Sequence, residues 1–212
     1  MLAPIIGILL FTLCYLVAAL LYPGGSQANK TSIGFSWINN YWCNLLNDTA
    51  MNGQPNPARP VAIAGMFFLC ITLSIFWFLF PIQTGIGKFA RLTIQIAGIF
   101  SMTIALFLFT KWHDEITNLA SLFGLVATVS SFVVLYKINW YGLFAFGIIN
   151  LLLVALNNYV YYTKGLIIYL PVIQKITFAA FLVWVCCINV SLYQRQKKNC
   201  AVEKNTGNPP LF

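Results

Sequence analysis

Charged side chains are scarce in this chain of 212 residues. Asp, Glu, Lys and Arg make up 8% of it, whereas soluble domains contain about 25%. It has only four acids and a single histidine. The low charge excludes an ordinary water-soluble fold. One histidine and the absence of any C-x-x-C spacing leave too few ligands for a zinc site of the usual kind, so we expect no metal and no cofactor.

The six cysteines do not predict a disulfide framework. Four of them lie in apolar runs, where a thiol behaves as a small apolar side chain, namely Cys14, Cys70, Cys186 and Cys187. Cys43 is the only cysteine in the loop 23–60, which we expect to lie outside the cytoplasm. Cys200 lies in the C-terminal tail, which we place on the opposite side of the membrane.

Long apolar runs are what the chain has in abundance. A helix needs roughly 20 apolar residues to cross the hydrocarbon core of a bilayer, and 60% of the residues are hydrophobic. Backbone groups in lipid must bond within their own segment, and the runs show no barrel-like alternation, so each predicts a helix. We therefore predict an all-α, polytopic membrane protein with six transmembrane helices. The runs are Ala3–Tyr22, Val61–Phe80, Phe89–Phe109, Ile116–Tyr136, Trp140–Leu156 and Val172–Tyr193.

The distribution of basic residues predicts the orientation. Arg195, Lys197 and Lys198 directly follow the last run, while the loop 23–60 holds two basic residues over its whole length. Lys and Arg are enriched in cytoplasmic loops, so we expect both termini in the cytoplasm and the loop 23–60 outside. Much of the net charge of +8 then comes from basic residues that hold the cytoplasmic segments on the inner side of the membrane. We therefore expect no nucleic-acid partner.

The chain is expected to comprise two parts. Residues 1–193 form the six-helix transmembrane domain, and its first outer loop, 23–60, forms a cap. Residues 194–212 are basic and then rich in Asn and Pro, which predicts a disordered cytoplasmic tail.

The cap contains a stretch with helical periodicity. Between residues Phe35 and Asp48, apolar side chains recur at helical spacing and polar ones form the opposite stripe, which predicts a short interfacial helix with Ser36 as its N-cap. We expect this helix to lie flat over the outer mouth of the bundle. The apolar face is Ile38, Tyr41, Trp42 and Leu45, and the polar face includes Asn40, Asn44 and Asn47.

Charged groups gather on the same side. His113, Asp114 and Glu115 follow the third run, and Lys175 lies about one turn inside the last run. An ammonium in hydrocarbon costs about 3 kcal/mol unless it snorkels or finds an anion, so we predict that Lys175 reaches Asp114, Glu115 or Asp48. Three simpler interpretations stay open: a solvated charged turn, a snorkelling lysine, and asparagines that only satisfy loop backbone.

Small residues recur every four positions in the third and fourth runs. Such residues let two helix backbones approach closely, which predicts contact between these helices. They are Ala97, Ser101 and Ala105 in the third run, and Ala120, Gly124 and Thr128 in the fourth. No chain of ionisable groups crosses the membrane, which disfavours an ion-coupled transporter.

Several motifs occur in the loops and at the ends of the apolar runs. They are Tyr22-Pro23-Gly24-Gly25, Gly34-Phe35-Ser36-Trp37, Asn39 to Leu45, Asn52 to Pro60, His113-Asp114 and Gln174-Lys175. Together they resemble the motifs of domain of unknown function nine hundred and ninety-eight, a bacterial six-helix membrane family similar in layout to Frag and DRAM-type membrane proteins. The resemblance implies a bacterial inner-membrane protein with no established activity.

Two functions from different classes fit these residues. The first is a binding or assembly module whose polar cap holds membrane lipids, with other membrane proteins as further candidate partners. The second is a small membrane hydrolase or transferase that acts on a lipid headgroup, with His113 as general base oriented by Asp114. No nucleophile is identifiable, and Ser36 is only a candidate. The candidate ligand-binding residues are Asn40, Asp48, Arg59, Glu115 and Lys175.

Overall fold

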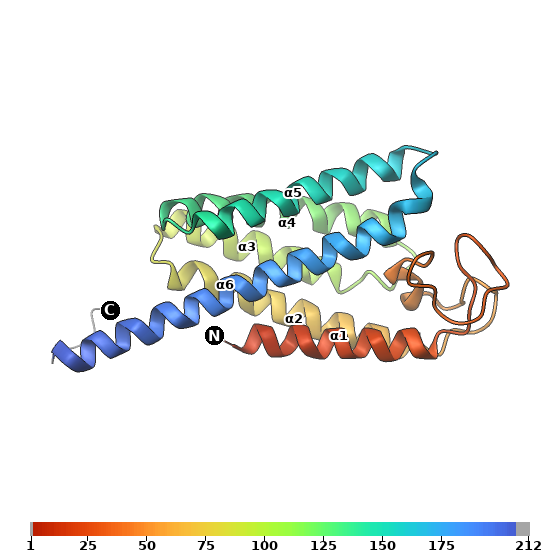
Figure 1. Ribbon diagram of the computed structural model, residues 1–212, viewed down its shortest axis with the longest axis horizontal. Coiled ribbons are helices and arrows are strands. Elements are labelled where there is room, and N and C mark those ends of the chain that lie inside the picture. Colours follow the sequence, from red (N-terminus) through yellow and green to blue (C-terminus); the bar gives the residue numbers. More distant parts are fainter. Residues whose placement is uncertain (1, 207–212) are drawn as a thin grey trace.

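Six long α-helices make up most of the structure (Figure 1). The computed structural model describes residues 2–206, with the side chains of 201–206 left aside. Within that range the all-α prediction is confirmed, since no named strand is present. The helices are α1 (Ala3–Leu21), α2 (Arg59–Gln83), α3 (Lys88–Ala105), α4 (His113–Lys137), α5 (Tyr141–Tyr162) and α6 (Leu170–Thr206), with 3-10 helices η1 (Trp42–Leu46) and η2 (Ile167–Tyr169).

Five segments are long and apolar enough to cross a membrane: α1, α2, α4, α5 and the stretch Ile167–Cys200, which covers η2 and most of α6. The third predicted run, Phe89–Phe109, is not among them. Its helix α3 has 18 residues, opens with Lys88 and Arg91, and ends at Ala105. The apolar residues beyond Ala105 lie in turns, so charge at one end and early termination at the other shorten the apolar length of α3.

The predicted contact between the third and fourth helices is confirmed. The hydroxyl of Ser101 on α3 donates a hydrogen bond of 2.7 Å to the carbonyl oxygen of Ala120 on α4. A Cβ at Gly124 would lie 3.1 Å from Ser101 Oγ. Close backbone approach also joins α3 to α2, because a Cβ at Gly98 would lie 2.2 Å from the ring of Trp77. Small residues therefore hold α2, α3 and α4 together as one tightly packed unit.

The connections divide between the two ends of the bundle (Figure 1). The long loop between α1 and α2 lies at one end, with the α3–α4 and α5–α6 connections. The N-terminal end of α1 lies toward the other end, as does the C-terminal part of α6. The polar loop residues singled out in the sequence are consequently brought to one end of the molecule.

The loop between α1 and α2 lacks the predicted interfacial helix over Phe35–Asp48. Residues 37–39 form a turn, Tyr41 is extended, and only η1 is helical. Side-chain amides explain the difference. Asn40 Oδ1 accepts from the Ser36 amide at 2.9 Å, and Asn44 Oδ1 accepts from the Tyr41 amide at 2.6 Å. These bonds compete with helical backbone bonding, as Asn side chains commonly do.

Other side chains anchor the same loop. Asn56 Nδ2 donates to three loop carbonyls, of which Asn47 is the nearest at 2.9 Å, and Asn56 Oδ1 accepts from the Ala58 amide at 3.2 Å. The Tyr22 hydroxyl accepts from the Met51 amide at 2.9 Å. Partial burial raises the pKa of Tyr22, which keeps this phenol neutral at physiological pH. The cap is therefore a hydrogen-bonded structure rather than a loose linker.

The last helix is longer than predicted. α6 continues from Leu170 to Thr206, so the residues 194–206 that were assigned to a disordered tail are helical. Gln, Arg and Lys, which dominate positions 194–198, are good helix formers that extend an existing helix at little cost. The rest of the predicted tail, 207–212, lies outside the described residues.

Candidate functional site

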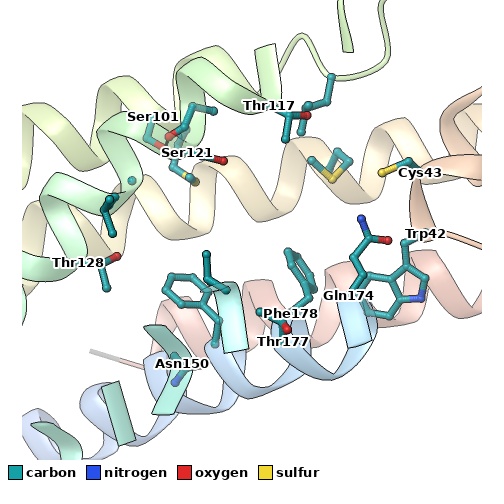
Figure 2. A pocket seen from close by; sticks show the side chains of 18 of the residues that line it. Trp42, Cys43, Ser101, Thr117, Ser121, Thr128, Asn150, Gln174, Thr177 and Phe178 are labelled. Carbon is teal, nitrogen blue, oxygen red and sulfur yellow. Dashed lines mark hydrogen bonds between the residues drawn. The ribbon is translucent and has the colours of Figure 1, made fainter. Parts of the chain in front are cut away.

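A cavity of about 440 Å³ lies between the helices and is partly open, since its lining residues Thr117 and Ser121 are exposed. Figure 2 shows α4 on one side of it and α6 on the other, with Trp42 and Cys43 of η1 at one end. Its volume falls within the range of about 300–1,000 Å³ that is usual for small-molecule sites. The wall is mainly apolar and rich in aromatic residues and methionine, including Phe11, Tyr15, Met66, Met102, Phe178 and Phe181.

One face of α4 supplies a row of small and polar side chains to this wall. Thr117, Ser121, Gly124 and Thr128 all line the cavity, and their spacing of three or four residues places them on one side of the helix. Figure 2 shows the hydroxyl groups of Ser121 and Thr128 at the cavity. Thr128 was predicted as a helix-contact residue, but it faces the cavity.

Trp42 closes the cap end of the cavity. Its ring packs between α1 and α6, with ring centroids 5.9 Å from Phe11, 5.4 Å from Tyr15 and 5.1 Å from Phe178. Trp42 therefore does not lie on an interfacial helix, because its ring is inserted into the bundle. The insertion also fixes the neighbouring Cys43 at the cavity wall.

Lys175 lies at the same end and has no acidic partner among the described residues. Its ammonium donates a hydrogen bond of 2.5 Å to the backbone carbonyl oxygen of Asn40 and lies 6.0 Å from the centroid of the Phe35 ring. The predicted ion pair with Asp114, Glu115 or Asp48 is wrong. The cap folds over Lys175 and offers it a carbonyl dipole, so the positive charge at the cavity end is not neutralised.

His113 and Asp114 are in contact at the start of α4. His113 Nδ1 and Asp114 Oδ1 lie 3.1 Å apart, and the carboxylate is largely exposed. The other ring nitrogen, Nε2, is buried and has no protein hydrogen-bond partner. His113 lines the cavity, and so does Cys43. The structure therefore brings Cys43, His113 and Lys175 together at one end of the cavity.

The remaining candidates lie outside the cavity. Asp48 forms a 2.7 Å ion pair with Arg59, whose Nε also donates to the Leu46 carbonyl at 3.0 Å. The Asn40 side chain is fully buried and bonds Ser36 and Gly25 within the loop.

Two further candidate residues, Glu115 and Ser36, do not line the cavity either. Glu115 lines a separate shallow depression on the outer side of α3 and α4, beside Trp112. Ser36 Oγ accepts from the Asn39 amide at 3.2 Å. Apart from Lys175, the polar residues predicted to bind a ligand therefore stabilise the cap or face outward.

Unpartnered polar atoms concentrate at the cavity. Seven buried side-chain nitrogen or oxygen atoms among the described residues have no hydrogen-bond partner, and five of them belong to cavity-lining residues. Buried polar groups without partners are costly and rare, so a cluster of them indicates a place where a ligand or water supplies the missing bonds. The five are Trp42 Nε1, Trp77 Nε1, His113 Nε2, Asn150 Oδ1 and Gln174 Oε1.

Sequence reasoning missed most of this site. The sequence places Cys43 only in a loop, and it does not bring Thr117, Ser121 and Asn150 together. The usable signal was the run of hydroxyl residues at positions 117, 121 and 128, which repeats on one helix face within an apolar segment. No group of three or more His, Cys, Asp or Glu suited to a metal occurs in the part of the chain that the structure describes.

No protein-family model, curated protein or solved structure matches this chain. The family resemblance of the loop motifs consequently stays a prediction.

Proposed function

We propose that this protein is a six-span membrane protein that binds one amphipathic lipid, with an acyl chain in the cavity and the headgroup beside Lys175. The observation that carries the proposal is the concentration of unpartnered buried polar atoms around a mainly apolar cavity of about 440 Å³. This proposal retains the lipid-binding function predicted from the sequence. It places the binding site in the cavity between the helices instead of on the surface of the cap.

The headgroup decides the selectivity of such a site. An acyl chain that leaves the bilayer for the cavity exchanges one apolar environment for another and gains little hydrophobic free energy. Polar interactions at the cap end must therefore favour the bound state. Lys175 has positive charge without an acidic partner there, and its ammonium has three donors, of which Asn40 uses one. We therefore propose an anionic glycerolipid, held by its phosphate.

The orientation and the sixth span belong to the same proposal. Helix α3 is packed between α2 and α4, so it would cross together with them despite Lys88 and Arg91, which would lie at the interface. The loop between α1 and α2 then lies outside the cytoplasm and both termini lie inside, as in the inner membrane of a bacterium. The suspected family membership fits this location.

Photo-crosslinking tests the lipid site. The purified protein would be reconstituted in nanodiscs that contain phosphatidylglycerol with a diazirine in its acyl chain, and crosslinked peptides would be mapped by mass spectrometry. We expect crosslinks to residues of the cavity wall such as Phe178 and Leu151. Crosslinks confined to the bilayer-facing side chains of the helices would contradict the proposal.

A matched pair of variants on α4 controls for general effects. Ser121→Phe places a ring in the cavity, whereas Leu122→Phe places the same ring at the next position, which is 59% exposed and does not line the cavity. We expect Ser121→Phe to reduce the cavity crosslinks by about tenfold, which corresponds to roughly 1.4 kcal/mol, and Leu122→Phe to leave them unchanged. Equal yields from both variants would exclude binding inside the cavity.

A further inference from the structure

The end of the cavity near the cap holds the parts of a nucleophilic site. Cys43 is a free cysteine that lines the cavity, and His113 lines the same cavity. Asp114 Oδ1 lies 3.1 Å from Nδ1 of the His113 ring, and the other ring nitrogen, Nε2, is buried without a protein hydrogen-bond partner. A nucleophile, a base and a group that orients the base are thus present in the order that acyl-transfer sites use.

The other cysteines lack these neighbours. Cys14, Cys70, Cys186 and Cys187 lie within helices and do not line the cavity, and Cys200 is exposed near the far end of α6. Cys43 reaches its position because Trp42, the residue before it, is inserted between α1 and α6. The 3-10 helix thus serves to present one thiol to the cavity.

From this geometry we infer that Cys43 is an acyl-accepting nucleophile and that the protein transfers the acyl chain of a lipid ester through a Cys43 thioester. The inference rests on the proposed lipid site, since the cavity must hold the chain whose ester reacts. Nε2 of His113 takes the proton of the Cys43 thiol, and the sulfur attacks the carbonyl carbon of the ester. The carbon–oxygen ester bond breaks, and the leaving alkoxide takes the proton from His113 to leave as the lysolipid alcohol.

The second half-reaction regenerates the thiol. Water or an acceptor alcohol gives its proton to His113 as its oxygen attacks the thioester carbonyl. The carbon–sulfur bond breaks, and the thiolate recovers the proton. The acyl chain leaves as a fatty acid or a new ester, with no oxidant or reductant required. In both halves the carbonyl oxygen becomes negative, and Lys175 supplies positive charge at this end of the cavity.

Acyl transfer is tested with phosphatidylglycerol that carries an alkyne-tagged palmitoyl chain. The reconstituted protein would be incubated with it, and two products measured: a hydroxylamine-sensitive palmitoyl mass on the Cys43 peptide and free lysophosphatidylglycerol. We expect both from the wild-type protein and neither from Cys43→Ala. Cys14→Ala and Cys200→Ala should match the wild type.

The base and its positioning residue have separate readouts. His113→Asn should slow lysolipid release by at least about a hundredfold, since a positioned general base contributes that much. Asp114→Asn should lower the maximal rate and move the acid limb of its pH profile to lower pH, because the imidazole loses its proton more easily without the carboxylate. A purely structural role of Asp114 would leave the position of that limb unchanged.

Crosslinking to the cavity wall separates this inference from the proposed function. If the diazirine lipid crosslinks inside the cavity but the wild-type protein gives neither Cys43 acylation nor lysolipid, acyl transfer is excluded and lipid binding stands. If crosslinking into the cavity also fails, both the lipid-binding site and the acyl transfer at Cys43 are excluded. Lysolipid release that persists at the wild-type rate in Cys43→Ala or His113→Asn would likewise overturn the assigned roles.

Discussion

The ammonium of Lys175 and the backbone carbonyl oxygen of Asn40 lie 2.5 Å apart, across 135 positions of sequence. This hydrogen bond joins the first turns of α6 to the cap loop and so closes one end of the cavity. Because the acceptor is a neutral peptide group, the lysine keeps its net charge at the site. That charge is available to a ligand in a way that an ion-paired lysine would not be.

Replacement of Lys175 separates stability from binding. Lys175→Met removes a hydrogen bond from a charged donor, worth about 1.5–3 kcal/mol, but it also removes the cost of burying an ammonium, about 3 kcal/mol on insertion scales. We expect the free energy of unfolding to change by no more than about 1.5 kcal/mol, which shifts the Tm by at most about 6 °C in a chain of this size. Thermal unfolding in detergent measures it.

The same variant should lose selectivity for anionic lipid. In competition crosslinking, wild-type protein should prefer phosphatidylglycerol to phosphatidylcholine, Lys175→Arg should retain the preference, and Lys175→Met should abolish it. Lys164→Met, at an exposed position in the α5–α6 connection, is the matched control and should behave as wild type. A fall in Tm much larger than about 6 °C in Lys175→Met would show instead that the lysine is a structural requirement.

Packing of α3 on α2 predicts a contrast between two glycines. A Cβ at Gly98 would lie 2.2 Å from the Trp77 ring, whereas a Cβ at Gly142 on α5 would meet nothing within 4 Å. Gly98→Ala should therefore destabilise the bundle by about 1–3 kcal/mol, as overpacked cores do. Gly142→Ala should be neutral or stabilising by up to about 1 kcal/mol through helix propensity. Unfolding in SDS measures both, and similar values for the two variants would contradict the close α2–α3 approach.

Asn56 provides a test of the cap. Its amide bonds the carbonyls of Asn44, Leu45 and Asn47, so Asn56→Ala leaves several buried carbonyls without their donor. Each buried group left unsatisfied costs about 1–3 kcal/mol, and we expect the loop to open and become sensitive to protease. Gln54→Ala removes an exposed side chain from the same loop and should not increase cleavage. Resistance in both variants would mean that the cap is held by other contacts.

The apolar helices could be predicted from the sequence because length and hydrophobicity alone determine them. The contact of Ser101 with Ala120 was also accessible, since small residues at four-residue spacing mark close helix pairs. The α3 boundary was not, because Leu106 to Phe109 are apolar yet form turns. Apolar character predicts partition into the membrane but does not by itself maintain a helix to its end.

The cap and the site depended on contacts that leave no sequence pattern. Asn40 and Asn44 were read as one polar helix face, but their amides bond loop backbone and prevent the helix. The partner of Lys175 is a backbone carbonyl, which has no residue type to search for. Cys43 became a candidate only when the insertion of Trp42 placed it at the cavity. Asn side chains in loops often bond to nearby backbone groups and so compete with helix formation. This tendency was the one sequence feature that argued against a helix over Phe35–Asp48.

Orientation in the membrane gives a final prediction. The fold places the N-terminal end of α1 and the C-terminal part of α6 toward the end opposite the cap (Figure 1), and the basic residues after Tyr193 favour the cytoplasm for that end. Cys200 and a cysteine introduced by Gln54→Cys should therefore react from opposite sides. In intact cells an impermeant maleimide should label position 54 and spare Cys200, and permeabilisation should expose Cys200. Labelling of Cys200 alone in intact cells would invert the topology and place the cavity end with Lys175 at the cytoplasmic leaflet.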